Sequence, residues 1–275
     1  GLGDVYKRQV HVVSLVGQPK ERATWPKSFV IGMGKNANQH LFHASSILEY
    51  VIENGILLID KPAGWTSFDV VAKIRGARRA QFRSAGVTPT KRQLRVGHAG
   101  TLDPFATGLL VILLGEDTKK AEQFLKLNKT YEATIRLGQT STTADPEGEI
   151  VAVSDRQPSS QELLTALESF IGTIQQRPPA HSAIKIDGQR AYKLARKGET
   201  VEIPLRTVTI HTLELLDYTY PNVKIRTHVS SGTYIRSLAV DIGEKLGTGG
   251  YCSRLRRTQI GEWSISEAVS VEATT

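Results

Sequence analysis

Two segments of this chain alternate between apolar and polar residues with a period of two, and this restricts its fold more than any other feature. One side of the first segment holds Tyr131, Ala133, Ile135 and Leu137, and one side of the second holds Val223, Ile225, Thr227 and Val229. Such alternation is typical of β-strands with one face on the core. We therefore expect a sheet with one buried face and Tyr131 pointing inward near the beginning of a strand.

Three other segments have the spacing or the start signals of helices. Apolar residues recur in them three or four positions apart, and a capping residue or a glycine stands at a boundary. These segments are 68–74, preceded by Thr66 and Ser67; 159–170, with Ser159 and Glu162 at capping-box spacing; and 235–246, followed by Gly247. Strands interspersed with helices predict a mixed α/β (α+β) fold.

Two short apolar runs add further elements. Residues 55–60 are typical of a buried strand that ends at a turn, whereas residues 108–114 fit either a strand or a buried helical turn. The longest wholly apolar run, Leu109 to Leu114, is far shorter than the roughly 18 residues of a membrane-spanning helix. We expect no membrane segment.

The charge of the chain is positive and unevenly distributed. Lys and Arg number 35 against 27 Asp and Glu, a formal net charge of +8. Between Val70 and Gly97 the chain has no acidic residue but carries Lys73, Arg75, Arg78, Arg79, Arg83, Lys91, Arg92 and Arg95, and a second cluster holds Arg254, Arg256 and Arg257. We interpret the first stretch as a loop after the 68–74 helix. Its charge fits a polyanionic partner or a solvated surface.

Cysteine and histidine usage restricts the chemistry. Cys252 is the only cysteine, which excludes an internal disulfide framework and a multi-cysteine zinc site and fits a reducing cytoplasm. The histidines show no ligand spacing with acidic partners. We therefore expect no metal centre.

The segment Gly97–Gly108 has the densest turn signals in the chain. Its three glycines permit close backbone approach, and Pro104 biases Asp103 away from helix. A carboxylate held in this way suits a nucleophile, although Asp-Pro is also a common turn dipeptide. His98 in the same segment suits a general base, a stacking surface or a hydrogen-bonded loop residue.

The segment Gly232–Arg236 is the second informative one. If Thr233 caps the following helix, Arg236 lies in its first turn, where a cation opposes the helix dipole by about 0.3–1 kcal/mol. A partner carboxylate or phosphate would offset this. An exposed arginine that tolerates the position is the alternative.

Taken together, these blocks resemble the TruB family of tRNA pseudouridine synthases. The resemblance runs from about Asn54 to Ala268, and its blocks occur in the family's order. They are GILLIDKPAGWTS at 55–67, GHAGTLDPFATG at 97–108, KTY at 129–131, RLG at 136–138, SGTYIR at 231–236 and LRR at 255–257.

The resemblance implies the pseudouridine synthase fold, a mixed and largely antiparallel sheet with helices around one active-site cleft. It implies isomerisation of a uridine in the T loop of tRNA, at position 55, without cofactor or metal. Asp103 would be the catalytic aspartate, and the resemblance leaves open whether it attacks the base or the sugar. Arg236 would pair with Asp103 and keep it ionised.

Other site residues follow from the same resemblance. Tyr131 would stack on the flipped uracil and assist proton movement, Tyr234 and Leu255 would line the pocket, and His98 would occupy the place of the extruded base. Lys61 and Pro62 match an architectural block. The predicted contacts to the RNA backbone are Lys73, Arg78, Arg79, Arg95 and Arg257.

The resemblance also frames the domain organisation. We expect residues 1–54 to be a poorly patterned extension that is not native before Met33, and residues 55–275 to be the catalytic domain of a monomer. Between Arg79 and Val96 the chain is longer than the compact form of the family motif. No C-terminal PUA domain is seen, so we expect a weaker grip on tRNA.

Three other functions compete with a stand-alone tRNA enzyme. A guide-dependent ribonucleoprotein relative shares the Leu-Asp-Pro block, although the sequence Phe-Ala-Thr-Gly at 105–108 favours the bacterial, stand-alone type. A tRNA-binding folding chaperone would use the same cleft. A glycosidase would need two cooperating carboxylates, and Asp69, Asp117 and Asp145 do not lie in comparable blocks.

Overall fold

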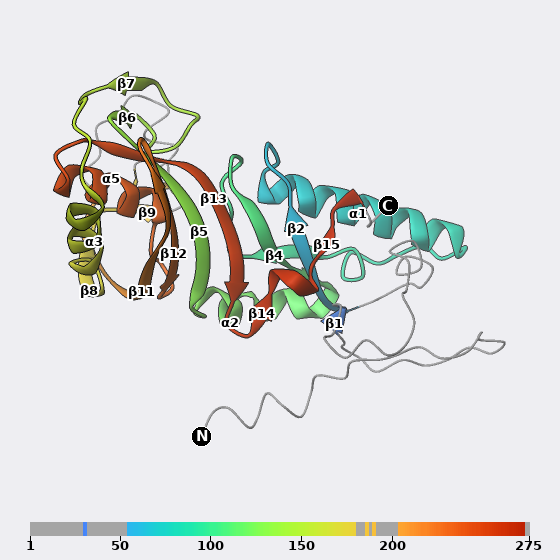
Figure 1. The fold of residues 1–275 in the computed structure, drawn as a ribbon. Coiled ribbons are helices and arrows are strands. Elements are labelled where there is room, and N and C mark those ends of the chain that lie inside the picture. The colour runs from blue at the N-terminus through green and yellow to red at the C-terminus, as the bar shows by residue number, and fades with distance from the viewer. Residues whose placement is uncertain (1–29, 32–53, 180–184, 187–188, 191–202, 273–275) are drawn as a thin grey trace, which may run out of the picture. The chain divides into compact units, whose positions relative to one another are not determined.

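The computed structural model describes residues 30–31, 54–179, 185–186, 189–190 and 203–272. The chain forms two compact units, and the predicted catalytic region at 55–275 contributes to both (Figure 1). Unit 1 comprises Gly1–Leu125 and Glu262–Thr275, and unit 2 comprises Lys126–Gly261. Within the described residues, no helix is long and apolar enough to cross a membrane. Most residues of the predicted extension, Met33 included, lie outside the described part.

Unit 1 contains a small sheet built on β2 and β4. β4 pairs antiparallel with both β2 and β3, and β2 pairs in parallel with β1 and β15. The strands are β1 (Val30–Ile31), β2 (Gly55–Lys61), β3 (Val96–Ala99), β4 (Thr107–Leu114), β14 (Trp263–Ser264) and β15 (Val269–Ser270). The strand predicted at 55–60 is confirmed. The open choice at 108–114 is resolved as a strand, because its residues are buried within the sheet.

The helices of unit 1 begin with α1 (Ser67–Ser84), which starts as predicted. Thr66 is its N-cap, since the Asp69 amide donates to Thr66 Oγ1 at 3.1 Å and the Thr66 amide donates to Asp69 Oδ2 at 2.8 Å. Thr66 Oγ1 also donates to Asp69 Oδ2 at 2.7 Å, and this bond, followed by the one from the Thr66 amide, lowers the pKa of the Asp69 carboxyl. The shorter elements are η2 (Gly115–Lys120), α2 (Ala121–Leu125) and η3 (Ile265–Glu267).

The predicted end of this helix at Ile74 is wrong, because α1 continues to Ser84. The buried stripe that begins with Val70 and Ile74 continues at the same spacing with Arg78 and Phe82. Arg78 replaces an apolar residue in the stripe, which hid the period from sequence reasoning. Four of the seven cations assigned to the loop therefore lie on the helix, namely Arg75, Arg78, Arg79 and Arg83.

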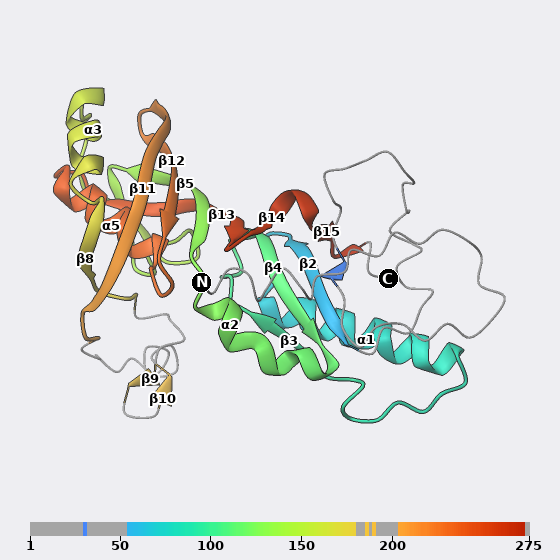
Figure 2. The same ribbon diagram turned by 90° about the horizontal axis from the view of Figure 1, so that it is seen from below.

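Unit 2 contains a larger antiparallel sheet in the order β13–β5–β12–β11–β8 (Figure 2). Its strands are β5 (Lys129–Leu137), β8 (Gly172–Gln176), β11 (Arg206–Thr219), β12 (Asn222–Val229) and β13 (Gly250–Ile260). β5 and β12 confirm the two alternating segments. Two short hairpins accompany the sheet, β6 (Gln139–Ser141) with β7 (Ile150–Ala152) and β9 (Lys185–Ile186) with β10 (Gln189–Arg190). The predicted mixed, largely antiparallel fold is confirmed.

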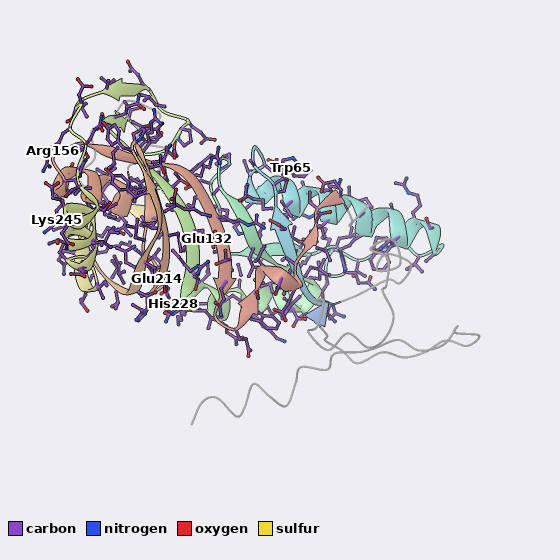
Figure 3. The ribbon with its side chains drawn as sticks, in the orientation of Figure 1. Trp65, Glu132, Arg156, Glu214, His228 and Lys245 are labelled. Atoms are coloured by element: carbon purple, nitrogen blue, oxygen red, sulfur yellow. The ribbon has the colours of Figure 1, made fainter. Side chains whose placement is uncertain are left out.

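The two faces of this sheet differ as the alternation predicts. Ala133 and Ile135 of β5 and Ile225 of β12 are buried on the core face. On the polar face, Arg226 Nη2 donates to Glu132 Oε1 at 2.8 Å, and both side chains are partly exposed. Figure 3 labels Glu132 with two other polar side chains of this sheet, Glu214 and His228.

Both helices predicted in unit 2 are present. α3 (Ser160–Glu168) starts with the predicted capping box of Ser159 and Glu162. α5 (Ile235–Lys245) is followed by Gly247 at φ 67°, a left-handed conformation that favours glycine. A Cβ on Gly243 would collide with the carbonyl group of Gly249, so α5 approaches the backbone just before β13 closely enough to require glycine.

One carboxyl of α5 makes stability depend on pH. Burial, followed by the nearby charge of Glu244, raises the pKa of Asp241 to about 6. Because the pKa in the folded state lies above the ordinary 3.8, ionisation of Asp241 lowers the free energy of unfolding. The loss grows as pH rises from about 4 to 6 and is complete above pH 6. We expect Asp241→Asn to raise the free energy of unfolding by roughly 1–2 kcal/mol at pH 7 and by almost nothing at pH 4.

Urea unfolding at both pH values measures this effect. Asp217→Asn, which removes an exposed carboxylate from β11, is the control and should leave stability unchanged at both values. An equal gain from Asp241→Asn at pH 4 and pH 7 would contradict the assignment.

Candidate active site

The segment Gly97–Gly108 forms the end of β3, a short loop and the beginning of β4. Gly100 and Gly108 each have φ of 102°, in the region that favours glycine, so the loop needs a residue without Cβ at both ends. Between them the Ala106 amide donates to the Asp103 carbonyl at 3.1 Å, which closes a turn around Pro104. Asp103 is half-buried at the head of this turn.

The backbone on one side of Asp103 is tied to the beginning of α1, and on the other side to the turn before this helix. The Leu102 amide donates to Ser67 Oγ at 2.8 Å, and Ser67 Oγ donates to the Leu102 carbonyl at 3.1 Å. On the other side, the Gly64 amide donates to the Pro104 carbonyl at 2.9 Å. Asp103 is therefore held by its neighbours' main chain, as a positioned nucleophile requires.

Lys61 provides a third tie to the same loop. Its side chain is fully buried, and Nζ donates to the carbonyls of Pro62 at 2.8 Å, Trp65 at 2.6 Å and Pro104 at 3.2 Å. An ammonium surrounded by carbonyl oxygens suits a structural cross-link between the turn after β2 and the loop. This geometry agrees with the architectural role expected for the Lys61–Pro62 block.

The other predicted residues of unit 1 are His98 and four cations. His98 is half-buried on β3, where it pairs with Ile112 of β4. Arg79 is exposed on α1, and Lys73 Nζ lies 5.8 Å from the centre of the Trp65 ring. Arg95 is exposed, with Nη1 3.8 Å from Glu116 Oε1.

Arg78 corrects the predicted set of RNA contacts. Only 3% of the residue is exposed, and Nη2 donates to the Gln93 carbonyl at 2.5 Å. The guanidinium ties the segment before β3 to α1, so it does not present a free cation to phosphate. The prediction that Arg78 contacts the RNA backbone is wrong for this structure.

In unit 2, Tyr131 lies in the third position of β5 on the core face and is 8% exposed, as the alternation predicts. It pairs with Arg257 of β13, and Ala133 pairs with Leu255. Opposite residues of an antiparallel pair point to the same side, so Tyr131, Leu255 and Arg257 share one face. Arg257 is only 1% exposed, which is at odds with its predicted contact to RNA.

Lys129 at the beginning of β5 adds an unusual charge near Tyr131. The side chain is buried, and Nζ donates to the Leu127 carbonyl at 2.5 Å. Burial, followed by the positive charge of Arg257, lowers the pKa of Lys129 to about 8. A lysine with this pKa exchanges its proton near physiological pH.

Tyr234 is positioned by an amide side chain that sequence reasoning missed. It is the N-cap of α5, and it is Gln176 that holds its backbone: Oε1 accepts from the Tyr234 amide at 2.8 Å, and Nε2 donates to the Tyr234 carbonyl at 3.1 Å. The expected cap at Thr233 is wrong, since Thr233 Oγ1 instead donates to the Ser230 carbonyl at 3.0 Å. No short-range signal links Gln176 on β8 to Tyr234.

Arg236 has the anionic partner that its place in the helix predicts. Nη1 donates to Asp145 Oδ2 at 2.7 Å and to the Thr143 carbonyl at 2.9 Å, and both charged side chains are buried. The alternative of an exposed, unpartnered arginine is therefore wrong. The predicted pairing with Asp103, a residue of unit 1, stays a prediction.

Asp145, the partner of Arg236, was considered from the sequence only as a possible glycosidase acid. It lies in the turn between β6 and β7, where Oδ1 accepts from Thr143 Oγ1 at 2.5 Å and from the Glu147 amide at 3.0 Å. Ala144 beside it has φ of 62°, rare for a residue with Cβ. The turn signal Asp-Pro-Glu-Gly at 145–148 was visible, but its partner lies 91 residues away.

The structure gathers the predicted residues into two groups. Unit 1 holds Asp103 with His98, and unit 2 holds Tyr131 with Leu255, and Tyr234 with Arg236. Among the described residues there is no group of three or more His, Cys, Asp or Glu side chains that could hold a metal ion. The chemistry available from these side chains is that of a carboxylate, a phenol and a guanidinium.

Comparisons with known proteins point to one family. A model described as the N-terminal domain of TruB family pseudouridylate synthase matches residues 88–235, and a model described as the C-terminal domain of tRNA pseudouridylate synthase B matches residues 236–274. The tRNA pseudouridine synthase B of Phocaeicola vulgatus is 47% identical over 222 residues, 80% of this chain and 92% of that protein. The enzyme of the same name from Thermobifida fusca is 44% identical over 231 residues, 80% of this chain and 73% of that protein.

The solved structures include similar folds. A structure titled as a Cbf5-Nop10-Gar1 complex matches with a TM-score of 0.57 and 28% identity. The match covers 85% of this chain but 58% of that chain, so this protein spans less than two thirds of it.

Proposed function

This chain belongs to the TruB family of pseudouridylate synthases, and on that basis we propose that it converts uridine to pseudouridine at position 55 in the T loop of tRNA. The observation that carries the proposal is Asp103 at the head of a turn whose flanking residues are tied to the beginning of α1 and to the turn before this helix. A carboxylate fixed by main-chain bonds on both sides is held in place before substrate binds.

The proposed reaction rearranges bonds without changing composition. Asp103 attacks the target nucleotide, at the base or at the sugar, and the bond between N1 of uracil and C1′ of ribose breaks. The freed uracil turns and C5 bonds to C1′. The bond that Asp103 formed breaks and returns its electron pair to the carboxylate, while C5 loses its proton and N1 gains one. Substrate and product are isomers, so the proposed reaction has no stoichiometric need for a cofactor or a metal.

Arg236 is proposed to hold Asp103 in its ionised form. A guanidinium carries five N–H donors in a fork, enough to serve Asp145 and a second carboxylate. The buried Asp145 and Thr143 carbonyl fix the position of this fork. Arg236 thus acts through Asp103 and is a positioning residue in this proposal.

Base flipping is the proposed route to a uridine inside a folded loop. Unstacking a base costs a few kcal/mol. This cost is lower when one side chain stacks on the flipped base and another fills the place that the base has left. We assign the uracil contact to Tyr131, the pocket lining to Tyr234 and Leu255, and the place of the extruded base to His98. Tyr131 is also proposed to assist the proton transfer. The remaining candidates for phosphate contacts are Lys73, Arg79 and Arg95.

Two alternative functions are a guide-dependent pseudouridine synthase and a tRNA-binding folding chaperone. The tRNA pseudouridine synthase B of Phocaeicola vulgatus is 47% identical to this chain, whereas the chain in the structure titled as a Cbf5-Nop10-Gar1 complex is 28% identical. The higher identity to a protein named without partners supports a stand-alone enzyme over a guide-dependent one. A folding chaperone would use the same surfaces, so only a chemical product separates it from the enzyme.

The test is incubation of the purified chain with an unmodified tRNA transcript and no guide RNA, followed by chemical mapping of pseudouridine. We expect one modified position, the T-loop uridine 55. Product only when a guide RNA is added, or tRNA binding without product, would contradict the proposal. A transcript with cytidine in place of that uridine is the control and should yield no product.

A further inference from the structure

The outer face of α1 is a surface from which the proposed function uses only Arg79, as a candidate phosphate contact. The buried stripe of the helix belongs to the core of unit 1, where Val70 and Ile74 cluster with strand residues such as Ile59 of β2. The opposite face carries exposed residues at spacings of three and four, which places them in one row. This row, named here the outer row, consists of Phe68, Ala72, Gly76, Arg79 and Arg83.

The outer row begins beside the catalytic loop. Phe68 follows Ser67, whose hydroxyl bonds both the amide and the carbonyl of Leu102. The Phe68 residue is 63% exposed, although it is aromatic and lies next to the buried Ser67. At 1.5 Å per residue the row extends for roughly 22 Å from Phe68 to Arg83, well beyond a single nucleotide.

The cations of α1 divide into two sets by their contacts. Arg75 Nη2 donates to the carbonyl of Val96, the first residue of β3, at 3.1 Å. Arg78 Nη2 donates to the Gln93 carbonyl, so one guanidinium ties β3 and the other the segment before it to the helix. Arg79 and Arg83 are exposed and form no ion pair within the described part of the chain. Their charge therefore faces solvent.

The segment that follows α1 carries further cations, which share one carboxylate. Glu116 Oε1 lies 3.7 Å from Arg92 Nε and 3.8 Å from Arg95 Nη1, and Oε2 lies 2.5 Å from Lys119 Nζ. One carboxylate thus faces three cations, which lower its pKa, Lys119 foremost. Arg92, Arg95, Lys119 and Glu116 together therefore carry a net positive charge.

Small residues separate the aromatic and cationic ends of the row. Ala72 projects only a methyl group, and a Cβ added at Gly76 would meet nothing within 4 Å. A polymer can approach the helix closely between Phe68 and Arg79. This surface suits a nucleic acid, whose bases stack on aromatic rings and whose phosphates pair with arginine. It offers an exposed ring, two small residues that permit close approach, and two guanidiniums that face solvent.

We propose that the outer row of α1 is a tRNA-binding surface outside the catalytic pocket, in which Phe68 stacks on an exposed base and Arg79 and Arg83 pair with backbone phosphates. The inference rests on the proposed function, because that function supplies tRNA as the substrate. Its role is affinity: the row holds RNA next to the loop that carries Asp103 and takes no part in the chemistry.

The test compares binding of one unmodified tRNA transcript across a salt series. We expect Arg79→Gln/Arg83→Gln to weaken binding about 10-fold near 0.1 M salt and to reduce the slope of log K against log salt by roughly 1.5. Phe68→Ala should weaken binding at least about 5-fold without changing the slope, because stacking releases no counterions. In steady-state assays both losses should appear mainly in KM.

The matched control removes the same charge from unit 2. Arg206→Gln/Lys245→Gln neutralises two exposed cations, of which Lys245 lies in the last turn of α5 (Figure 3), and should leave tRNA affinity near that of the wild type. Thermal unfolding should be unchanged in all variants, since the replaced side chains are exposed.

Separate outcomes identify which proposal fails. If Arg79→Gln/Arg83→Gln binds tRNA like the control, the surface proposal is overturned, and an acidic protein would be the better partner for this face. If Phe68→Ala binds like the wild type, the stacking contact is wrong. If the wild type yields no pseudouridine in any tRNA, the proposed function fails, whatever the binding data show.

Discussion

Replacement of Asp103 by asparagine is expected to reduce pseudouridine formation by at least about 10³-fold. The amide has nearly the same size, but it is neutral and a poor nucleophile. The ties that position the loop use the hydroxyl of Ser67 and the main chain of Leu102 and Pro104, so they do not depend on the replaced carboxylate. Folding and tRNA affinity should therefore remain close to those of the wild type.

Single-turnover product mapping, tRNA binding and thermal unfolding together check this expectation. Asp155→Asn, which neutralises an exposed carboxylate in unit 2, is the matched control and should retain activity. Product formation by Asp103→Asn within about tenfold of the wild-type rate would remove Asp103 from the proposed chemistry. It would leave membership of the family unaffected.

Replacement of Arg236 by methionine is expected to cost about 3–5 kcal/mol of unfolding free energy, because it leaves the carboxylate of Asp145 buried without its cation. The remaining bonds from Thr143 Oγ1 and the Glu147 amide place the cost near the lower end. Urea denaturation measures it. Arg226→Met, which breaks the exposed pair with Glu132, should cost less than about 1 kcal/mol.

A double-mutant cycle tests whether the loss comes from the pair. Adding Asp145→Asn to Arg236→Met removes the unpaired charge and should restore part of the stability. Independent, additive losses would show that the two side chains do not act as a pair. If the free energy of unfolding of Arg236→Met lies within about 1 kcal/mol of the wild-type value, the buried pair does not stabilise unit 2.

The helices and strands with a regular pattern followed from short-range signals. The capping box of Ser159 and the two-residue period of β5 and β12 each depend on residues within a few positions of one another. Local hydrogen bonds and the burial of one face decide such elements, so a sequence read alone reveals them.

α1 shows where this reasoning fails. Arg78 is a charged residue in the sequence, yet it occupies a buried position where an apolar residue is expected. Its guanidinium can be buried because it donates to the Gln93 carbonyl inside unit 1. The partner comes from a segment that the helix folds over. No pattern of hydropathy can distinguish such an arginine from an exposed one such as Arg79.

By itself the sequence determined the family and the mixed fold, because these depend on residue types in a fixed order along the chain. The assignment of Asp103 as the nucleophile comes from the same blocks and stays a prediction. Tertiary structure alone decided which charged and polar side chains form hydrogen bonds or ion pairs inside the protein. It paired Arg236 with Asp145, gave Tyr234 its support from Gln176, and separated the tied arginines of α1 from the exposed ones. The physical reason is that a buried charge or amide takes whichever partner the fold brings within hydrogen-bond distance, and those partners lie tens of residues away.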